Sequence, residues 1–158
     1  MRRAGRFFQT LSLLSALLLA APAGAVDLKA AAEVKLASGP APSAAPAGAR
    51  VYFIEPADGA TLSSPFKVVF GLTGMGVAPA GVQNDKTGHH HLLINQPPVD
   101  LGQPLPMTEQ VLHFGGGQTE TTVTLPPGRH TLQLVLGDWK HQPHAAPVAS
   151  PLITVTVR

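Results

Sequence analysis

The chain has 158 residues with 16 glycines, 16 prolines and no cysteine, which predicts one domain rich in turns and excludes disulfides and cysteine-based sites. Charged residues make up only 13% and apolar residues 44% of the chain, so the composition is that of a folded protein rather than a disordered one. The formal net charge is +2, and its origin lies at the N-terminus.

Residues 1–25 have the pattern of a secretory signal peptide. Three arginines within the first six residues precede an apolar stretch at 11–21, and small residues at 23–25 form a cleavage site. The apolar stretch is shorter than the roughly 20 residues that span a bilayer. We therefore expect a periplasmic or secreted protein with no membrane span after cleavage, while retention as an uncleaved anchor stays open.

Cleavage after residue 25 would leave 8 Lys and Arg against 9 Asp and Glu. The mature chain then has no basic cluster, so we expect no nucleic-acid binding. Residues 26–49 would form a short segment and an Ala/Pro-rich linker that its prolines keep extended.

Residues 50–158 alternate between short apolar-patterned stretches and turn residues, with no convincing helix. We predict a seven-stranded antiparallel Ig-like β-sandwich from this spacing. Leu132, Leu134 and Leu136 share one face and make their strand the best candidate for a central one. The seven strands are expected at 50–55, 66–73, 89–95, 111–114, 119–125, 130–137 and 151–158.

All seven histidines lie after residue 88, and three of them are consecutive. Because alternate side chains of a strand share a face, His89 and His91 would point together, about 6.6 Å apart along the strand. His90 would turn inward, in register with Leu92 and Ile94. Two imidazoles at this spacing can hold one metal ion, whereas three solvated histidines at a strand end would give the same pattern.

A second pair, His141 and His144, lies in the loop 138–150, which Pro143 stiffens. The two rings could face one point if the loop curls. Asp138 could orient one of these imidazoles through its second nitrogen, or it could cap the turn. A polar loop with no ligand role is the alternative interpretation.

His113 precedes three glycines at 115–117, which permit a tight bend, a bulge or a close approach of another backbone. This histidine is a candidate third ligand. His130 shares the face of the leucines in 130–137, a position more typical of a structural histidine.

Signals for hydrolytic catalysis are absent from the sequence. No nucleophile elbow, Ser-x-x-Lys or His-Glu-x-x-His pattern occurs. Carboxylates are sparse and scattered, which gives no support to a glycosidase. We therefore assign no catalytic residue and favour binding over catalysis.

The stretches GHHHL (88–92), HFGGGQTE (113–120) and LPPGRHTLQLVLGD (125–138) closely resemble an exported bacterial family, domain of unknown function 4399. The resemblance extends over 51–157 and implies a secreted or periplasmic Ig-like β domain. It implies no activity. The histidines of the family motifs would map onto His89, His90, His91, His113, His130, His141 and His144.

The leading hypothesis is a β-sandwich that binds a divalent transition metal, Cu(II) or Zn(II), because all-imidazole ligation suits these ions. His89 and His91 would be the core pair, completed by His113, His141 or His144. Binding should fail below about pH 6, where free imidazole is protonated. Met75 and Met107 could add thioether ligands for Cu(I).

Two rival hypotheses remain open. One is a metal-free envelope module that binds cell-wall polymer or a protein partner through its loops. The other is a metalloenzyme with an open coordination position. The sequence leaves the oligomeric state undecided.

Overall fold

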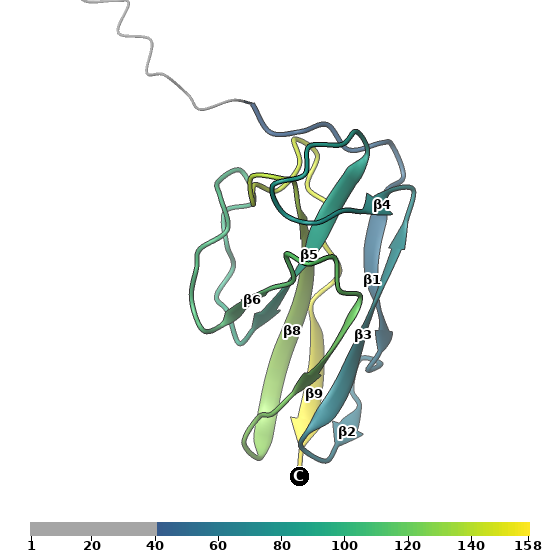
Figure 1. Cartoon of the computed structure of the whole chain (residues 1–158). Helices are drawn as coiled ribbons and strands as arrows, with labels where there is room; N and C mark the ends of the chain where they lie inside the picture. The colour runs from purple at the N-terminus through teal and green to yellow at the C-terminus, as the bar shows by residue number, and fades with distance from the viewer. Residues whose placement is uncertain (1–40) are drawn as a thin grey trace, which may run out of the picture. The chain divides into compact units, whose positions relative to one another are not determined.

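The computed structural model describes residues 41–158 and builds them from strands and loops alone. The predicted signal peptide and the segment 26–37 lie outside the described residues. Within 41–158 there is no helix that is long and apolar enough to cross a membrane. The strands are β1 (Arg50–Glu55), β2 (Thr61–Leu62), β3 (Phe66–Thr73), β4 (Gly76–Val77), β5 (Thr87–Ile94), β6 (Val111–His113), β7 (Glu120–Val123), β8 (Gly128–Gly137) and β9 (Ile153–Val157) (Figure 1).

Each of the seven predicted strands is present, and β1 and β3 have the predicted bounds. The predicted count of seven is nevertheless wrong, because β2 and β4 bring the described strands to nine. The expectation of purely antiparallel pairing is also wrong, since β2 pairs with β9 and β4 with β5 in parallel. Both extra strands are only two residues long, too short to show the period-two alternation by which a strand is recognised.

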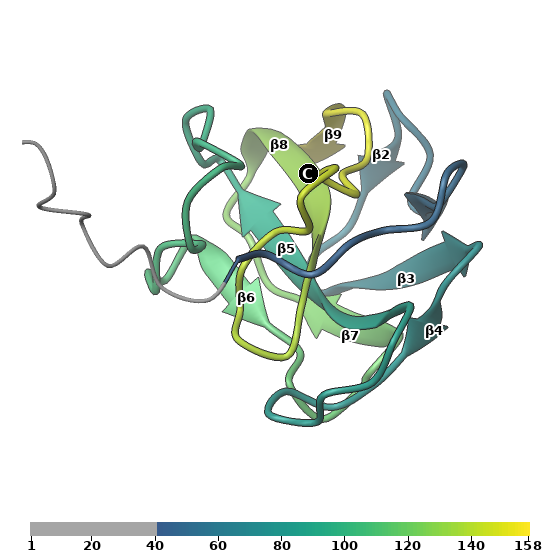
Figure 2. The same ribbon diagram turned by 90° about the horizontal axis from the view of Figure 1, so that it is seen from above.

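The strands form two sheets that share a hydrophobic core. One has the order β1-β3-β7, and the other has the order β2-β9-β8-β5-β4, with β6 also paired to β5. Figures 1 and 2 show β3 and β5 on different sheets of this β-sandwich-like arrangement. The buried core residues come from both sheets and include Val51, Phe66, Val68, Phe70, Leu92, Ile94, Val123, Leu132, Leu134, Leu136, Val155 and Val157.

Strand β8 lies at the centre of the larger sheet, between β9 and β5. Its residues Leu132, Leu134 and Leu136 are completely buried, which confirms the predicted central strand. Their shared face follows from the two-residue period of a strand. Burial of each leucine contributes about 1.5–3 kcal/mol to the stability of the domain.

The larger sheet also carries a second hydrophobic cluster, on its outer face. Leu93 and Val135 alternate along their strands with core residues, so they point away from the main core. They pack with Leu105 and Val111. The loop between β5 and β6 lies on this side of β5, away from β3, in both views (Figures 1 and 2). Strand β5 is therefore buried on both faces, and its outer face is the one that carries His89 and His91.

Replacing a central leucine should destabilise the domain strongly. We expect Leu134→Ala to lower the free energy of unfolding by about 3 kcal/mol, because the truncation leaves a cavity in a closely packed core. Leu152→Ala is the matched control, since Leu152 is 57% exposed and its truncation should change stability by less than about 0.5 kcal/mol. Urea denaturation measures both, and equal effects would contradict the described packing.

Candidate metal centre

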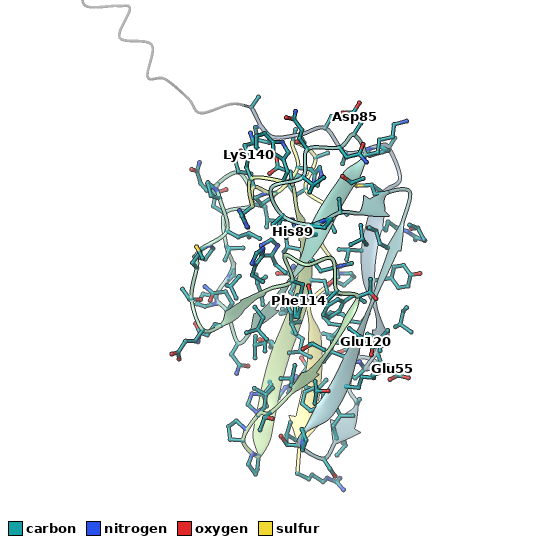
Figure 3. All side chains as sticks on the ribbon, viewed as in Figure 1. Glu55, Asp85, His89, Phe114, Glu120 and Lys140 are labelled. Carbon is teal, nitrogen blue, oxygen red and sulfur yellow. The ribbon has the colours of Figure 1, made fainter. Side chains whose placement is uncertain are left out.

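Strand β5 brings the first two histidines together. The ring centroids of His89 and His91 lie 4.8 Å apart, and the two side chains are 0% and 3% exposed. His90 points the other way, with its ring centroid 5.1 Å from that of Phe70 in the core. The predicted alternation is confirmed, and the alternative of three solvated histidines is excluded. Figure 3 shows His89 beside β5, enclosed by the surrounding loops.

Strand β6 supplies the third histidine. His113 is the direct cross-strand partner of His91, and its ring centroid lies 5.1 Å from His91 and 4.9 Å from His89. The ring lies over Gly115, where an added Cβ would come within 2.7 Å of the His113 Nε2 atom. One of the three consecutive glycines thus makes room for a side chain, whereas the sequence suggested a bend, a bulge or the approach of another backbone.

The loop after β8 supplies a fourth ring. The ring centroid of His141 lies 4.6 Å from that of His113, 5.0 Å from His89 and 6.2 Å from His91. His141 has a φ of 66°, a left-handed conformation that is uncommon for a residue with a side chain. Gly137, at the start of this loop, makes room for the ring of His91, because a Cβ there would approach the His91 Cε1 atom to 2.6 Å.

Asp138 fixes the shape of this loop. Its Oδ1 atom accepts hydrogen bonds from the backbone N–H groups of Lys140 at 2.8 Å and Gln142 at 3.1 Å. The backbone N–H of Asp138 donates to the Gln142 carbonyl at 2.7 Å, and that of His141 donates to the Asp138 carbonyl at 2.9 Å. Of the two predicted roles for Asp138, the structure therefore supports the turn cap, and Asp138 positions His141 through the backbone.

The other carboxylate oxygen of Asp138 holds the segment that precedes β1. Its Oδ2 atom accepts hydrogen bonds from the hydroxyl of Ser43 at 2.9 Å and from the Ser43 N–H at 3.3 Å. Burial alone would raise the pKa of Asp138, but hydrogen bonds from Lys140, Ser43 and Gln142 outweigh burial and lower it. Nothing in the Ala/Pro-rich sequence around Ser43 indicated this contact.

The fifth predicted ligand, His144, does not join the other four. Its Nε2 atom lies 3.3 Å from the Thr87 carbonyl oxygen, and its Cε1 atom would lie 3.1 Å from a Cβ on Gly88. Because Gly88 alternates with His89, His144 lies on the opposite face of β5. His-x-x-His spacing in this loop therefore brings only His141 to the cluster.

His130 has the structural role that its position predicted. Its Nδ1 atom lies 2.9 Å from the Asn95 amide nitrogen, and its Nε2 atom lies 2.8 Å from the Pro126 carbonyl oxygen. Both ring nitrogens therefore have partners within the domain, so this histidine is satisfied without a metal.

The geometry of the cluster fits one metal ion. One ligand atom from each of His89, His91 and His113 lies within 4.8 Å of the others. Metal–nitrogen bonds of about 2.0–2.1 Å in a tetrahedron place imidazole centroids about 5.2 Å apart. The centroid separations of the three rings are 4.8, 4.9 and 5.1 Å, so small rotations of the rings would complete the coordination.

Buried nitrogens of the cluster lack hydrogen-bond partners among residues 41–158. They are both ring nitrogens of His89 and the Nδ1 atom of His91. A buried polar group without a partner costs roughly 1–3 kcal/mol. A bound cation would give these lone pairs a partner.

The environment keeps the imidazoles neutral. Burial, together with the neighbouring His113 and His141, lowers the pKa of His89 to about 4, while Asp138 partly opposes them. Burial also lowers the pKa of His91 to about 3, together with the charges of the neighbouring histidines. The pKa of His113 is lowered by burial and by His141. At neutral pH these rings are therefore in the form that binds metal.

Comparison with protein families gives one match. The model described as domain of unknown function (DUF4399) matches residues 68–158, a range that contains all four clustered histidines. No curated protein and no solved structure matches the chain.

The metal-free domain should lose stability as the pH falls from 7 to 4. The pKa values of His89 and His91 in the folded state lie below the 6.5 of an unperturbed histidine. The unfolded chain therefore binds more protons in this window. Each of the two histidines lowers the free energy of unfolding by up to about 1.4 kcal/mol for each pH unit of acidification. Urea denaturation in the presence of EDTA at pH 7, 6 and 5 measures the slope.

The matched variant for this experiment is His89→Gln/His91→Gln. It lacks the two imidazoles whose pKa values are lowered but keeps all the carboxylates. Its stability should depend less steeply on pH between 7 and 5. An unchanged slope would contradict the burial of neutral imidazoles.

Proposed function

The chain belongs to the DUF4399 family, and we propose that it binds one divalent transition-metal ion through the imidazoles of His89, His91 and His113. The observation that carries the proposal is the convergence of three buried rings from two paired strands. Such a site would have three protein ligands, with the ring of His141 close to two of them. Binding rather than catalysis is the proposed role, because the sequence contains none of the motifs of hydrolytic catalysis.

The donor set favours Cu(II) or Zn(II). All its members are neutral nitrogens, which suit these two ions, and raw affinity favours copper. Met75 packs against the main core and therefore supplies no thioether to the site. Met107, the other methionine considered as a thioether ligand, is 95% exposed and is not enclosed with the histidine rings.

The proposal places the ion in an exported protein. The signal-peptide pattern of residues 1–25 supports a periplasmic or secreted location. Two sheets of short strands that share one core support an Ig-like sandwich as the finer description of the fold.

Metal titration tests the proposal directly. At pH 7.5 we expect Cu(II) and Zn(II) to bind with dissociation constants in the nanomolar to micromolar range, about 8–12 kcal/mol. The His89→Ala/His91→Ala variant should bind at least 100-fold more weakly, because it loses two of three ligands. Isothermal titration calorimetry, with a chelator competitor for tight binding, measures both.

His130→Gln is the control for this titration, since His130 lies outside the cluster. The metal affinity of this variant should equal that of the wild type. Binding weaker than about 100 µM, or equal binding by the double alanine variant, would overturn the proposal. A metal-free envelope module would then be the remaining interpretation.

Metal binding should persist below the pH of 6 that unperturbed imidazoles predict. The lowered pKa values of His89, about 4, and His91, about 3, mean that protons compete with the metal only under more acidic conditions. Cu(II) affinity at pH 7.5, 6, 5 and 4 tests this. A peptide of residues 87–94 is the control, because its exposed histidines should release the metal near pH 6. Loss of binding at the same pH in protein and peptide would contradict the prediction.

A further inference from the structure

A pocket of about 510 Å³ opens beside the histidine cluster. This volume lies within the range of about 300–1,000 Å³ that is typical of small-molecule sites. Three of its lining residues are His91, His113 and His141. A metal ion bonded to His91 and His113 would therefore border the pocket.

The remaining walls are mostly apolar. Leu105 and Val111 belong to the second hydrophobic cluster and are buried, so this side of the pocket is firmly packed. Met107, Thr108 and Glu109 also line the pocket and are exposed. The lining contains no lysine or arginine.

Three protein ligands would leave one position of a tetrahedral ion for a further ligand. His141 is 6.2 Å from His91 between ring centroids and lies outside the group of three whose ligand atoms approach within 4.8 Å. Its loop is joined to the pocket wall, since the Leu105 N–H donates to the His141 carbonyl at 3.4 Å. Because His91 and His113 both line the pocket, a fourth ligand from outside the chain could reach the ion from the pocket.

We infer that this pocket binds a small organic monoanion, such as a carboxylate with an apolar chain, whose oxygen occupies the fourth coordination position of the metal. Neutral imidazoles leave the charge of the ion uncompensated, which favours an anionic head group. The apolar walls favour an apolar body, and Glu109 disfavours a second negative charge. The inference rests on the proposed metal site.

Co(II) is the probe for this inference, because its visible spectrum reports changes in the coordination of the ion. The Co(II)-loaded protein is titrated with acetate, butyrate, hexanoate and octanoate. We expect a change in the d–d absorption with each anion and an affinity that rises by up to about fourfold per methylene, as each buried CH₂ contributes about 0.8 kcal/mol. The metal-free protein should bind octanoate at least tenfold more weakly.

A variant that fills the pocket distinguishes the contribution of the apolar chain to binding from that of the metal ion. Thr108→Trp should weaken octanoate binding at least tenfold, weaken acetate binding less, and leave the affinity for Co(II) unchanged. Thr156→Trp, at an exposed position on β9, is the matched control and should leave all three unchanged.

Each failure has a distinct meaning. If Co(II) binds but the affinity for the carboxylates does not depend on their chain length, the ligand pocket is overturned and the metal site stands. Equal affinity for octanoate with and without Co(II) would overturn the inference that the carboxylate coordinates the metal. Absence of Co(II) binding would overturn the proposed function and this inference together.

Discussion

The burial of imidazole nitrogens on the outer face of β5 is the constraint on which the rest of the site depends. A buried polar group without a partner is costly, and both nitrogens of His89 are in that position. The same holds for His90 on the inner face, so burial of a histidine does not by itself indicate a metal. What distinguishes the outer face is that the ligand atoms of three histidines meet there, whereas His90 packs against Phe70.

Loops and glycines make that convergence possible. The rings of His91 and His113 occupy space that a side chain at Gly137 or Gly115 would fill. The fourth ring depends on the turn that Asp138 caps, and Ser43 binds the same carboxylate from the segment before β1. Precise placement of the histidines thus relies on residues that carry no metal-binding chemistry of their own.

Alternation along a strand made part of the site predictable. The period of two placed His89 and His91 together and His90 with Leu92, because side-chain direction in a strand is a local property. Pairing of His113 with His91 was beyond local reasoning, since it depends on which strands become neighbours. The loop presented the same difficulty, because the Asp138 cap shapes the turn that brings His141 to the cluster, and nothing in the sequence placed His144 on the other face of β5.

The difference between strand and loop also bears on how the site would work. Paired strands hold side chains more precisely than loops do, and His89, His91 and His113 all lie on the paired strands β5 and β6. His141 is carried by a loop in a strained backbone conformation. An ion would therefore be held by the three strand-borne rings, while the side toward His141 and the pocket can adjust. Exchange of an external ligand at that side would leave the ion bound, which is the behaviour expected of a site that recognises a ligand through its metal rather than one that only stores the metal.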